Sequence, residues 1–176
     1  IEDKAKELKE AESALATLTG DDKQTIGAKK KKKEEENKLK VEKAERQRLI
    51  DEQNQQDIEK AVQAELELSQ AKIDAMDEGF KKQQEQIQLN YRKAKADNDR
   101  RTRQYIKDQQ DIERKEWEKE HPKYKEEGIV FVPKTKTKED LSQKKQDTLN
   151  EYDKVAVETR EKAEATLSKA LLEQYQ

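Results

Sequence analysis

Few side chains in this sequence have both the type and the spacing that enzyme chemistry requires. His121 is the single histidine, and there is no cysteine, so the common zinc sites that combine the two residue types are excluded. A lone histidine without a nearby serine partner also forms no nucleophile–base pair. His121 stands directly before Pro122, and we interpret it as a residue near the dipole at the end of a helix. The sequence therefore predicts a protein that is not an enzyme and has no catalytic residues, metal or cofactor.

Two further groups of residues invite a binding role. Asp97-Asn98-Asp99 lacks the glycine and the terminal glutamate of a calcium loop, and the sequence has no glycine-rich phosphate loop. Trp117 and Tyr124 flank the end of the predicted helix and the loop that follows it. We expect both rings to pack under that loop instead of stacking on a ligand.

Basic side chains are concentrated in two places. Lys29–Lys33 is followed at once by Glu34–Glu36, which cancels its field, so we interpret this run as the solvated start of a helix with Lys–Glu pairs four residues apart. A second patch lies between Tyr91 and Tyr105, and basic side chains beside aromatic rings can bind a nucleic-acid single strand. Its residues are Arg92, Lys93, Lys95, Arg100, Arg101 and Arg103. The interpretation we favour for this patch is a solvated helix face.

The composition predicts helices that cannot form an ordinary globular core. Of the 176 residues 45% are charged and only 30% hydrophobic, with 39 basic and 41 acidic residues giving a net charge of -2. Such a chain is disordered unless something orders it, and the abundant Ala, Glu, Lys, Gln, Leu and Arg are good helix formers. The near-zero net charge argues against a general polyanion binder. No apolar run approaches the roughly 18 residues of a membrane span.

A heptad-like seam runs from residue 62 to residue 94 in alternating steps of four and three. This spacing keeps one side of a continuous helix facing one partner, as in a coiled coil. The apolar members of the seam are Val62, Leu66, Ile73, Met76, Phe80, Ile87 and Ala94, and its polar members are Ser69, Gln83 and Asn90. We expect Phe80, midway between Ile73 and Ile87, to be a buried anchor of this seam.

The whole chain divides into five predicted segments. They are a short helix at 1–19, a turn at 20–27, a long coiled-coil-like helix at 28–121, a Pro-bounded loop with an apolar run at 122–137, and a return helix at 138–176. Thr137 and Asp140 have the spacing of a capping box. The predicted fold class is all-α, with elongated coiled-coil-like helices and helical hairpin returns at the ends of one very long helix. Because the chain begins at Ile1 without a methionine, we expect it to be a fragment of a longer protein.

The final helix is predicted to return antiparallel along the second half of the long helix. Both helices carry one-sided apolar stripes that neither can bury alone. In the predicted register Tyr152 or Val155 lies near Tyr105, and Leu167 lies near Ala94.

The segment AKIDAMDEGFKKQQEQIQLNY at residues 71–91 resembles the repeated helical segment of tail tape-measure proteins from Bacteroidetes phages and prophages. The likeness rests on Ile73, Asp74, Ala75, Met76, Glu78 and Gly79, on the Gln- and Leu-bearing run after them, and on a later Pro-containing aromatic loop from Trp117 to Pro133. It covers about residues 60–160. The resemblance implies a structural rod whose length sets tail length, present in the bacterial cytoplasm during assembly and then in the virion tail. It implies no catalytic residues, and its partners would be further copies or other tail proteins bound through the helical seam.

Two other functions remain open. One is a nucleic-acid-associated coiled coil that uses the two basic runs, which salt-dependent DNA binding would reveal. The other is a scaffold or adaptor coiled coil that binds a protein partner through its seam, which a stoichiometric partner would reveal.

Overall fold

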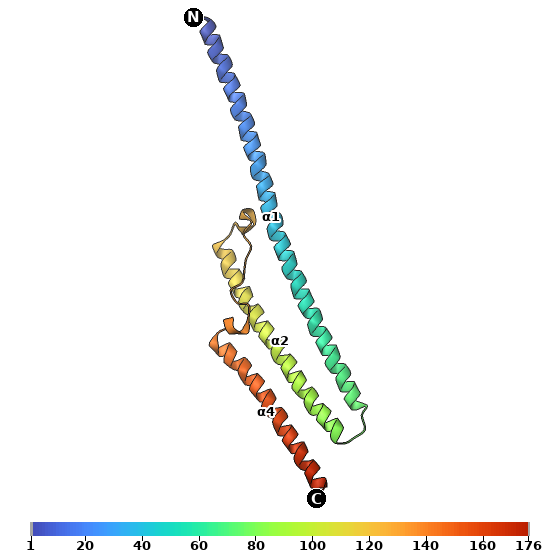
Figure 1. The fold of residues 1–176 in the computed structure, drawn as a ribbon. Coiled ribbons are helices and arrows are strands. Elements are labelled where there is room, and N and C mark those ends of the chain that lie inside the picture. The colour runs from blue at the N-terminus through green and yellow to red at the C-terminus, as the bar shows by residue number, and fades with distance from the viewer. Residues whose placement is uncertain (1, 176) are drawn as a thin grey trace. The chain divides into compact units, whose positions relative to one another are not determined.

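A computed structural model describes the backbone of residues 2–175 and the side chains of residues 25–175. The described chain is all-α and contains no strand, as predicted. Its elements are α1 (Glu2–Asp74), α2 (Phe80–Glu120), the four-residue α3 (Tyr124–Glu127), a 3-10 turn η1 (Lys138–Asp140) and α4 (Gln143–Gln174) (Figure 1). The three long helices have 73, 41 and 32 residues, so helix propensity and charge pairing order a chain that has little apolar surface to bury.

The chain divides into two compact units. The first comprises residues 1–48 and 121–130, and the second comprises residues 49–120 and 131–176. In the first unit Asn37 donates from Nδ2 to the carbonyl oxygen of Glu126 at 2.8 Å. Gly128 ends α3 at a φ of +68°, and a Cβ at this position would lie 2.6 Å from Oδ1 of Asn37. Both the left-handed backbone and this close approach therefore require glycine.

The predicted turn at 20–27 is wrong, because α1 runs through these residues without a break. A glycine inside a helix costs only about 1 kcal/mol relative to alanine, and strong helix formers on both sides outweigh that cost. Nothing lies within 4 Å of a Cβ built on Gly27, which is consistent with an exposed position inside a helix.

The predicted single helix at 28–121 is also wrong, because the chain turns at residues 75–79 and folds back on itself. The last backbone bond of α1 joins the amide of Met76 to the oxygen of Ile73, and the first bond of α2 joins Gln83 to Gly79. Gly79 has a φ of +155°, which residues with a Cβ rarely adopt. The sequence gives helical spacing across these residues, but it does not reveal that the two halves pack on each other.

Pro122 ends α2 as predicted, and the loop after it folds in a way that the sequence did not predict. Thr137 and Asp140 form the expected capping box, in which Oδ2 of Asp140 accepts from the amide of Thr137 at 2.9 Å. This box caps the short η1 turn instead of the long helix. A second irregular step follows, so α4 begins at Gln143 and not at residue 138.

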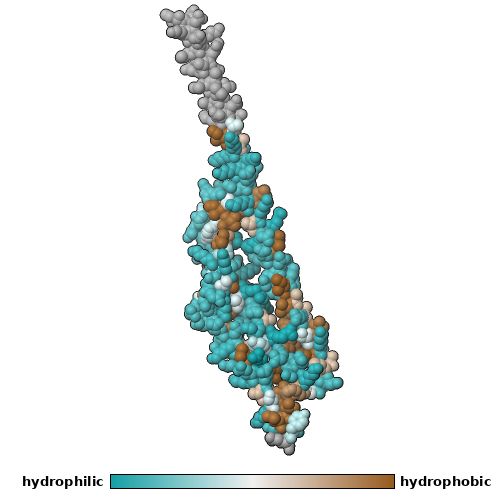
Figure 2. All heavy atoms as spheres, viewed as in Figure 1, coloured by the Kyte–Doolittle hydropathy of each residue, from teal (hydrophilic) through white to brown (hydrophobic). Residues whose placement is uncertain are grey.

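In the second unit α2 lies between the end of α1 and α4 (Figure 1). Helices α2 and α4 run antiparallel, as predicted, and they form the most extensive contact between two elements of the described chain. The buried apolar side chains form a thin core instead of one large cluster. They are Leu66, Ile73, Leu89, Leu141, Leu149 and Ala156. Figure 2 shows the consequence at the surface, where hydrophobic residues occur as small patches among hydrophilic ones.

The predicted register between α2 and α4 is wrong by about two to three helical turns. Tyr105 contacts Lys145, whose Nζ lies 5.5 Å from the ring centroid, while Tyr152 lies under Arg101. Likewise Gln88 hydrogen-bonds to Glu164, and Ala94 lines the same groove as Ala156. The part of α4 opposite Ala94 is therefore close to residue 156 and not to Leu167. The physical reason is the extended segment 131–135, which lies along the last turns of α2 and displaces the start of α4 along that helix.

Candidate functional site: the two faces of helix α2

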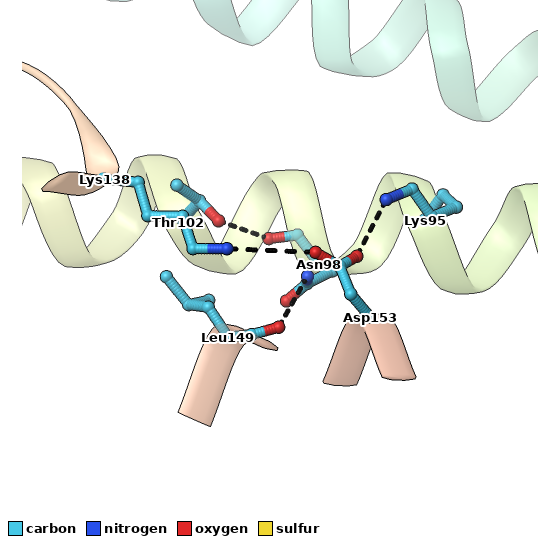
Figure 3. Close-up of polar contacts among 6 residues, drawn as sticks. All are labelled: Lys95, Asn98, Thr102, Lys138, Leu149 and Asp153. Atoms are coloured by element: carbon cyan, nitrogen blue, oxygen red, sulfur yellow. Dashed lines mark hydrogen bonds and ion pairs between the residues drawn. The ribbon is translucent and has the colours of Figure 1, made fainter. Parts of the chain in front are cut away.

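A buried polar cluster joins α2 to α4 (Figure 3). Asn98 is only 4% exposed, and its Nδ2 donates to the backbone oxygen of Leu149 at 3.1 Å. One turn along α2, Thr102 donates its hydroxyl to the backbone oxygen of Asn98. Leu149 is fully buried, so one apolar contact and one buried amide hold the same point of the interface. Buried asparagines in helix pairs are typical of positions that fix one register at a cost in stability.

An ion pair covers this cluster. Nζ of Lys95 lies 2.8 Å from Oδ1 of Asp153, and Nζ of Lys138 lies 3.9 Å from Oδ2 of the same carboxylate (Figure 3). The hydrogen bond from Lys95 lowers the pKa of Asp153 more than partial burial raises it, and the Asn98 amide lowers it further. The same bond raises the pKa of Lys95 against the opposing effect of burial. Both partners therefore stay charged over a wider pH range than they would in the unfolded chain.

A groove of about 300 Å³ lies beside this cluster between α2 and α4. Small and aliphatic side chains line it, together with aromatic rings that have guanidinium groups stacked on them. Arg101 lies 4.0 Å above the ring of Tyr152, and Arg160 lies 4.4 Å above the ring of Tyr91. The small and aliphatic lining residues are Ile87, Ala94, Val155, Ala156 and Ala163.

The opposite face of α2 contacts α1 through a different kind of interface. Near the turn, Leu66 and Ile73 of α1 bury Leu89 of α2, which is 2% exposed, and Met76 and Ala96 pack against this group. Beside this group the side-chain amides of Gln70 and Gln86 bond to each other at 2.8 and 3.1 Å, and farther from the turn ion pairs continue the contact. These pairs are Arg92–Glu65 at 2.7 Å, Arg103–Glu59 at 2.8 Å and Lys107–Glu52 at 3.8 Å.

The predicted seam is thus divided between two interfaces. Leu66 and Ile73 are buried, as expected, and Met76 packs beside them. Ile87 and Ala94 instead line the groove between α2 and α4. The expectation that Phe80 is a buried anchor is wrong in this structure, since Phe80 is 39% exposed and Val62 is 41% exposed. The sequence analysis also missed Leu89, which lies outside the 4,3 spacing and becomes a core residue only because the chain turns at residues 75–79.

The predicted basic patch forms no continuous positive surface, because its members contact partners on three helices. Arg92 and Arg103 pair with glutamates of α1, Lys95 pairs with Asp153 of α4, and Arg101 covers the Tyr152 ring. Of the remaining two, Lys93 donates to Gln70 at 2.8 Å and Arg100 lies 3.4 Å from Asp97. The interpretation as an exposed basic face was therefore too simple, because these side chains connect the helices.

The loop after α2 is held on the last turns of that helix by Glu113. Its carboxylate accepts from the amide of Lys134 at 2.8 Å and from the hydroxyl of Thr135 at 2.5 Å. Partial burial raises the pKa of Glu113, but these hydrogen bonds outweigh it, so the pKa lies below its ordinary value. Trp117 packs against Phe131 with ring centroids 5.6 Å apart, which confirms that this tryptophan packs under the loop.

The other predicted residues belong to the first compact unit. Lys29–Lys33 is exposed within α1, and His121 is half-buried directly after the end of α2. Among the residues whose side chains are described, no group of three or more His, Cys, Asp or Glu is arranged to hold a metal ion. Within the same part of the chain, no helix is both long and apolar enough to cross a membrane.

Comparisons with family models, with curated proteins and with solved structures find no match for this chain. The fold and the interfaces described above therefore carry the functional argument.

Proposed function

We propose that this chain is a structural helical segment of a phage tail tape-measure protein, the component whose length sets the length of the tail. The observation that carries the proposal is the 73-residue helix α1, followed after five residues by the 41-residue helix α2. A ruler needs a fixed rise per residue, and an α-helix supplies about 1.5 Å. Charged residues keep such helices soluble when they are extended. The resemblance of residues 71–91 to these proteins supports the same function.

In this proposal the chain acts in the bacterial cytoplasm during assembly and then in the virion tail. Its partners are further copies of the chain or other tail proteins, and the contacts are made through the seam residues. The chemistry is limited to reversible association of helices. The polar seam and the solvent-exposed ion pairs suit association of this kind, because such pairs stabilise an interface by only about 0.2–1 kcal/mol each.

The proposal is tested by changing the length of α1 in the phage genome. Deletion of residues 28–55 removes four heptads and should shorten the tail by about 42 Å if this segment lies along the tail as a helix. Duplication of the same residues should lengthen the tail by a similar amount. Electron microscopy of purified tails gives both lengths. A matched control replaces residues 28–55 with 28 residues of unrelated helical sequence and should restore the original length. Unchanged tail length after both deletion and duplication would contradict the proposal.

The groove between α2 and α4 favours a second candidate function, that of an adaptor which binds a helix of another protein. Its aliphatic lining residues follow helical spacing on both helices, as at Ile87 and Ala94 on α2. The guanidinium groups of Arg101 and Arg160, which also line the groove, complement carboxylates. The partner we propose for this function is therefore an amphipathic helix with acidic residues beside its apolar stripe.

This second function is tested with a designed helical peptide that carries a Leu/Ala stripe flanked by glutamates. Calorimetry should show binding to the whole chain, and Val155→Asp in the groove should weaken it at least tenfold. A peptide with lysines in place of the glutamates is the control for charge. Equal binding of both peptides, or of neither, would contradict the adaptor function. The nucleic-acid alternative receives less support, because the basic side chains between residues 92 and 103 are engaged within the fold.

A further inference from the structure

The turn at residues 75–79 lies between α1 and α2, and the heptad-like spacing of the seam continues across it without a change of phase. Ile73, Met76 and Phe80 continue the spacing of three and four, and Gln83 and Ile87 follow in step beyond the turn. A loop that served only to join two antiparallel helices would not need to preserve this phase. The sequence is therefore compatible with a second state in which α1 and α2 form one continuous helix.

The backbone around the turn needs little rearrangement to reach that state. Only Asp77 and Glu78 lie between the last bond of α1, made by Met76, and Gly79, whose oxygen accepts the first bond of α2. The segment contains no proline, and Glu78 already pairs with Lys82 at 2.6 Å with the four-residue spacing of a helix. Gly79 is the main obstacle, because its φ of +155° must change to the helical value.

The closed hairpin also leaves part of the seam without a partner. Val62 and Phe80 are 41% and 39% exposed, although Phe80 lies in the same row as the buried Leu66 and Ile73. Beside this small core Gln70 bonds to Gln86 and Lys93, and farther along the two helices the contact includes ion pairs whose side chains are between about one-third and two-thirds exposed. Breaking ion pairs of this kind costs little free energy, because water can solvate both charged groups.

We propose that residues 75–79 form a switch between the hairpin and a continuous helix, and that pairing with a second copy of this chain selects the continuous form. The seam is complementary to itself in a parallel, in-register pair. One row would place Ser69, Gln83 and Asn90 each against its own copy, where the two amide side chains can bond to each other across the pair. The other row would bury Phe80 between Ile73 and Ile87. The inference deepens the proposed tape-measure function and rests on it for its biological role, because a ruler works in its extended form.

The switch is tested by measuring one distance in the complete 176-residue chain. The natural sequence has no cysteine, so Lys60→Cys and Arg100→Cys introduce the only two thiols for spin labels. The side chains at these positions are 74% and 64% exposed, and their described ion pairs are local to their own helices. The labels should be within about 30 Å in the hairpin, where packed helix axes are about 10 Å apart. In the continuous helix the 40 residues between them span about 60 Å.

Pulsed electron–electron double resonance measures the distance between the two spin labels. An excess of unlabelled chain ensures that the measured distances lie within single molecules. The expected result is a short distance at low total concentration and a growing population near 60 Å as the concentration rises. Gly79→Ala should increase the long-distance population about fivefold, the usual factor for glycine against alanine in a helix. Gly27→Ala makes the same substitution inside α1 and should leave the distribution unchanged. If Gly79→Ala alone has too small an effect, Asp77→Ala/Gly79→Ala removes the second weak helix former of the turn.

A short distance at every concentration, in the parent chain and in both Gly79 variants, would overturn the switch. Long distances that do not depend on concentration would overturn the role of the second copy. These measurements need no phage, so failure of the switch and failure of the tape-measure function are distinguishable. A chain that switches while the tail-length experiment fails would retain the switch and lose the ruler. The reverse result would lose the switch and retain a ruler whose length comes from α1.

Discussion

The two faces of α2 form interfaces of opposite character. Toward α4 the contact contains the fully buried Leu149 and the buried amide of Asn98, with arginine–tyrosine stacking on both sides. Toward α1 the buried part is limited to three residues near the turn, and beyond them partly exposed ion pairs continue the contact. The same helix therefore has one partner fixed by packing and another held largely by charge.

This difference follows from how the two kinds of contact depend on solvent. Buried apolar groups and a desolvated amide accept only one arrangement, because any displacement leaves a cavity or an unpaired polar group. Exposed ion pairs are screened by salt and tolerate exchange of partners. We therefore expect the α2–α4 pair to behave as a fixed unit and the α1–α2 pair to be the part of the molecule that opens.

The largest expected effect tests the packed side of this comparison. Leu149→Ala should destabilise the α2–α4 pair by about 2–5 kcal/mol, because the side chain is completely buried and its removal leaves a cavity. Chemical denaturation followed by circular dichroism measures the loss. Val155→Ala on the same helix is the control, since Val155 is 49% exposed and should cost less than about 0.5 kcal/mol. Equal costs for the two variants would show that the interface is not packed as described.

The next prediction separates stability from register at Asn98. Asn98→Leu should leave stability unchanged or raise it by up to about 1 kcal/mol, because it removes a buried amide whose Oδ1 accepts no hydrogen bond within the described chain. The register should then become less unique. Cysteine pairs at Tyr105/Lys145 and at Tyr105/Tyr152 report the observed register and one shifted by seven residues.

In the parent chain only the first of these cysteine pairs should crosslink, whereas both should crosslink in the Asn98→Leu background. Asn150→Leu is the control, because it makes the same substitution at an exposed position of α4. A single register in the Asn98→Leu variant would mean that apolar packing alone aligns the helices.

A smaller effect is expected on the charged side of α2. Glu59→Gln removes the partner of Arg103 and should cost about 0.2–1 kcal/mol, since both side chains are about one-third exposed. Raising the salt concentration from 0.1 to 1 M should abolish most of this difference. Native-state hydrogen exchange should show the loss in residues 49–74 and not in α4. A salt-independent cost would indicate that this pair is buried more effectively than its exposure suggests.

The smallest expected effect is the pH dependence of the α2–α4 contact. The pKa of Asp153 is lower in the folded chain than its ordinary value of 3.8, so the stability from its charge is present above that value and is lost as the pH falls through the folded pKa. The pKa of Lys95 is raised above 10.5, so its contribution is present below 10.5 and is lost as the pH rises through the folded pKa. Melting temperatures of the parent chain and of Asp153→Asn should therefore converge at both extremes of pH. A constant difference between them from pH 2 to pH 12 would contradict this assignment.

Several features of the fold followed from local sequence. Pro122 stopped α2 because the residue before a proline disfavours helix, and Thr137 with Asp140 formed the capping box that their spacing predicts. The antiparallel return of α4 also followed, because one-sided stripes on two helices joined by a loop must bury each other. Other local signals failed. Gly20 and Gly27 were interpreted as a turn, although helix formers on both sides carry α1 through them.

The interfaces were only partly predictable. Leu66 and Ile73 were identified by their heptad spacing, but Leu89 became a core residue through a partner that sequence spacing does not indicate. The basic side chains near Arg92 were interpreted as one surface, yet the carboxylate partners of Arg92, Lys95 and Arg103 lie 27 to 58 residues away along the chain. Pairings over such distances depend on the placement of the turn and not on local spacing.

The sequence by itself determined that this protein is helical, highly charged and short of apolar residues, because propensity and periodicity act within a few residues of the chain. Only the tertiary structure decided where the long helix folds back, which face of α2 meets which partner, and in what register α4 lies. At residues 75–79 Asp77 and Gly79 lower the local preference for helix, and the energy gained by pairing distant segments selects the turn. The extended segment 131–135 likewise sets the register of α4, because its docking on Glu113 occupies the end of α2 that a direct helical return would have used.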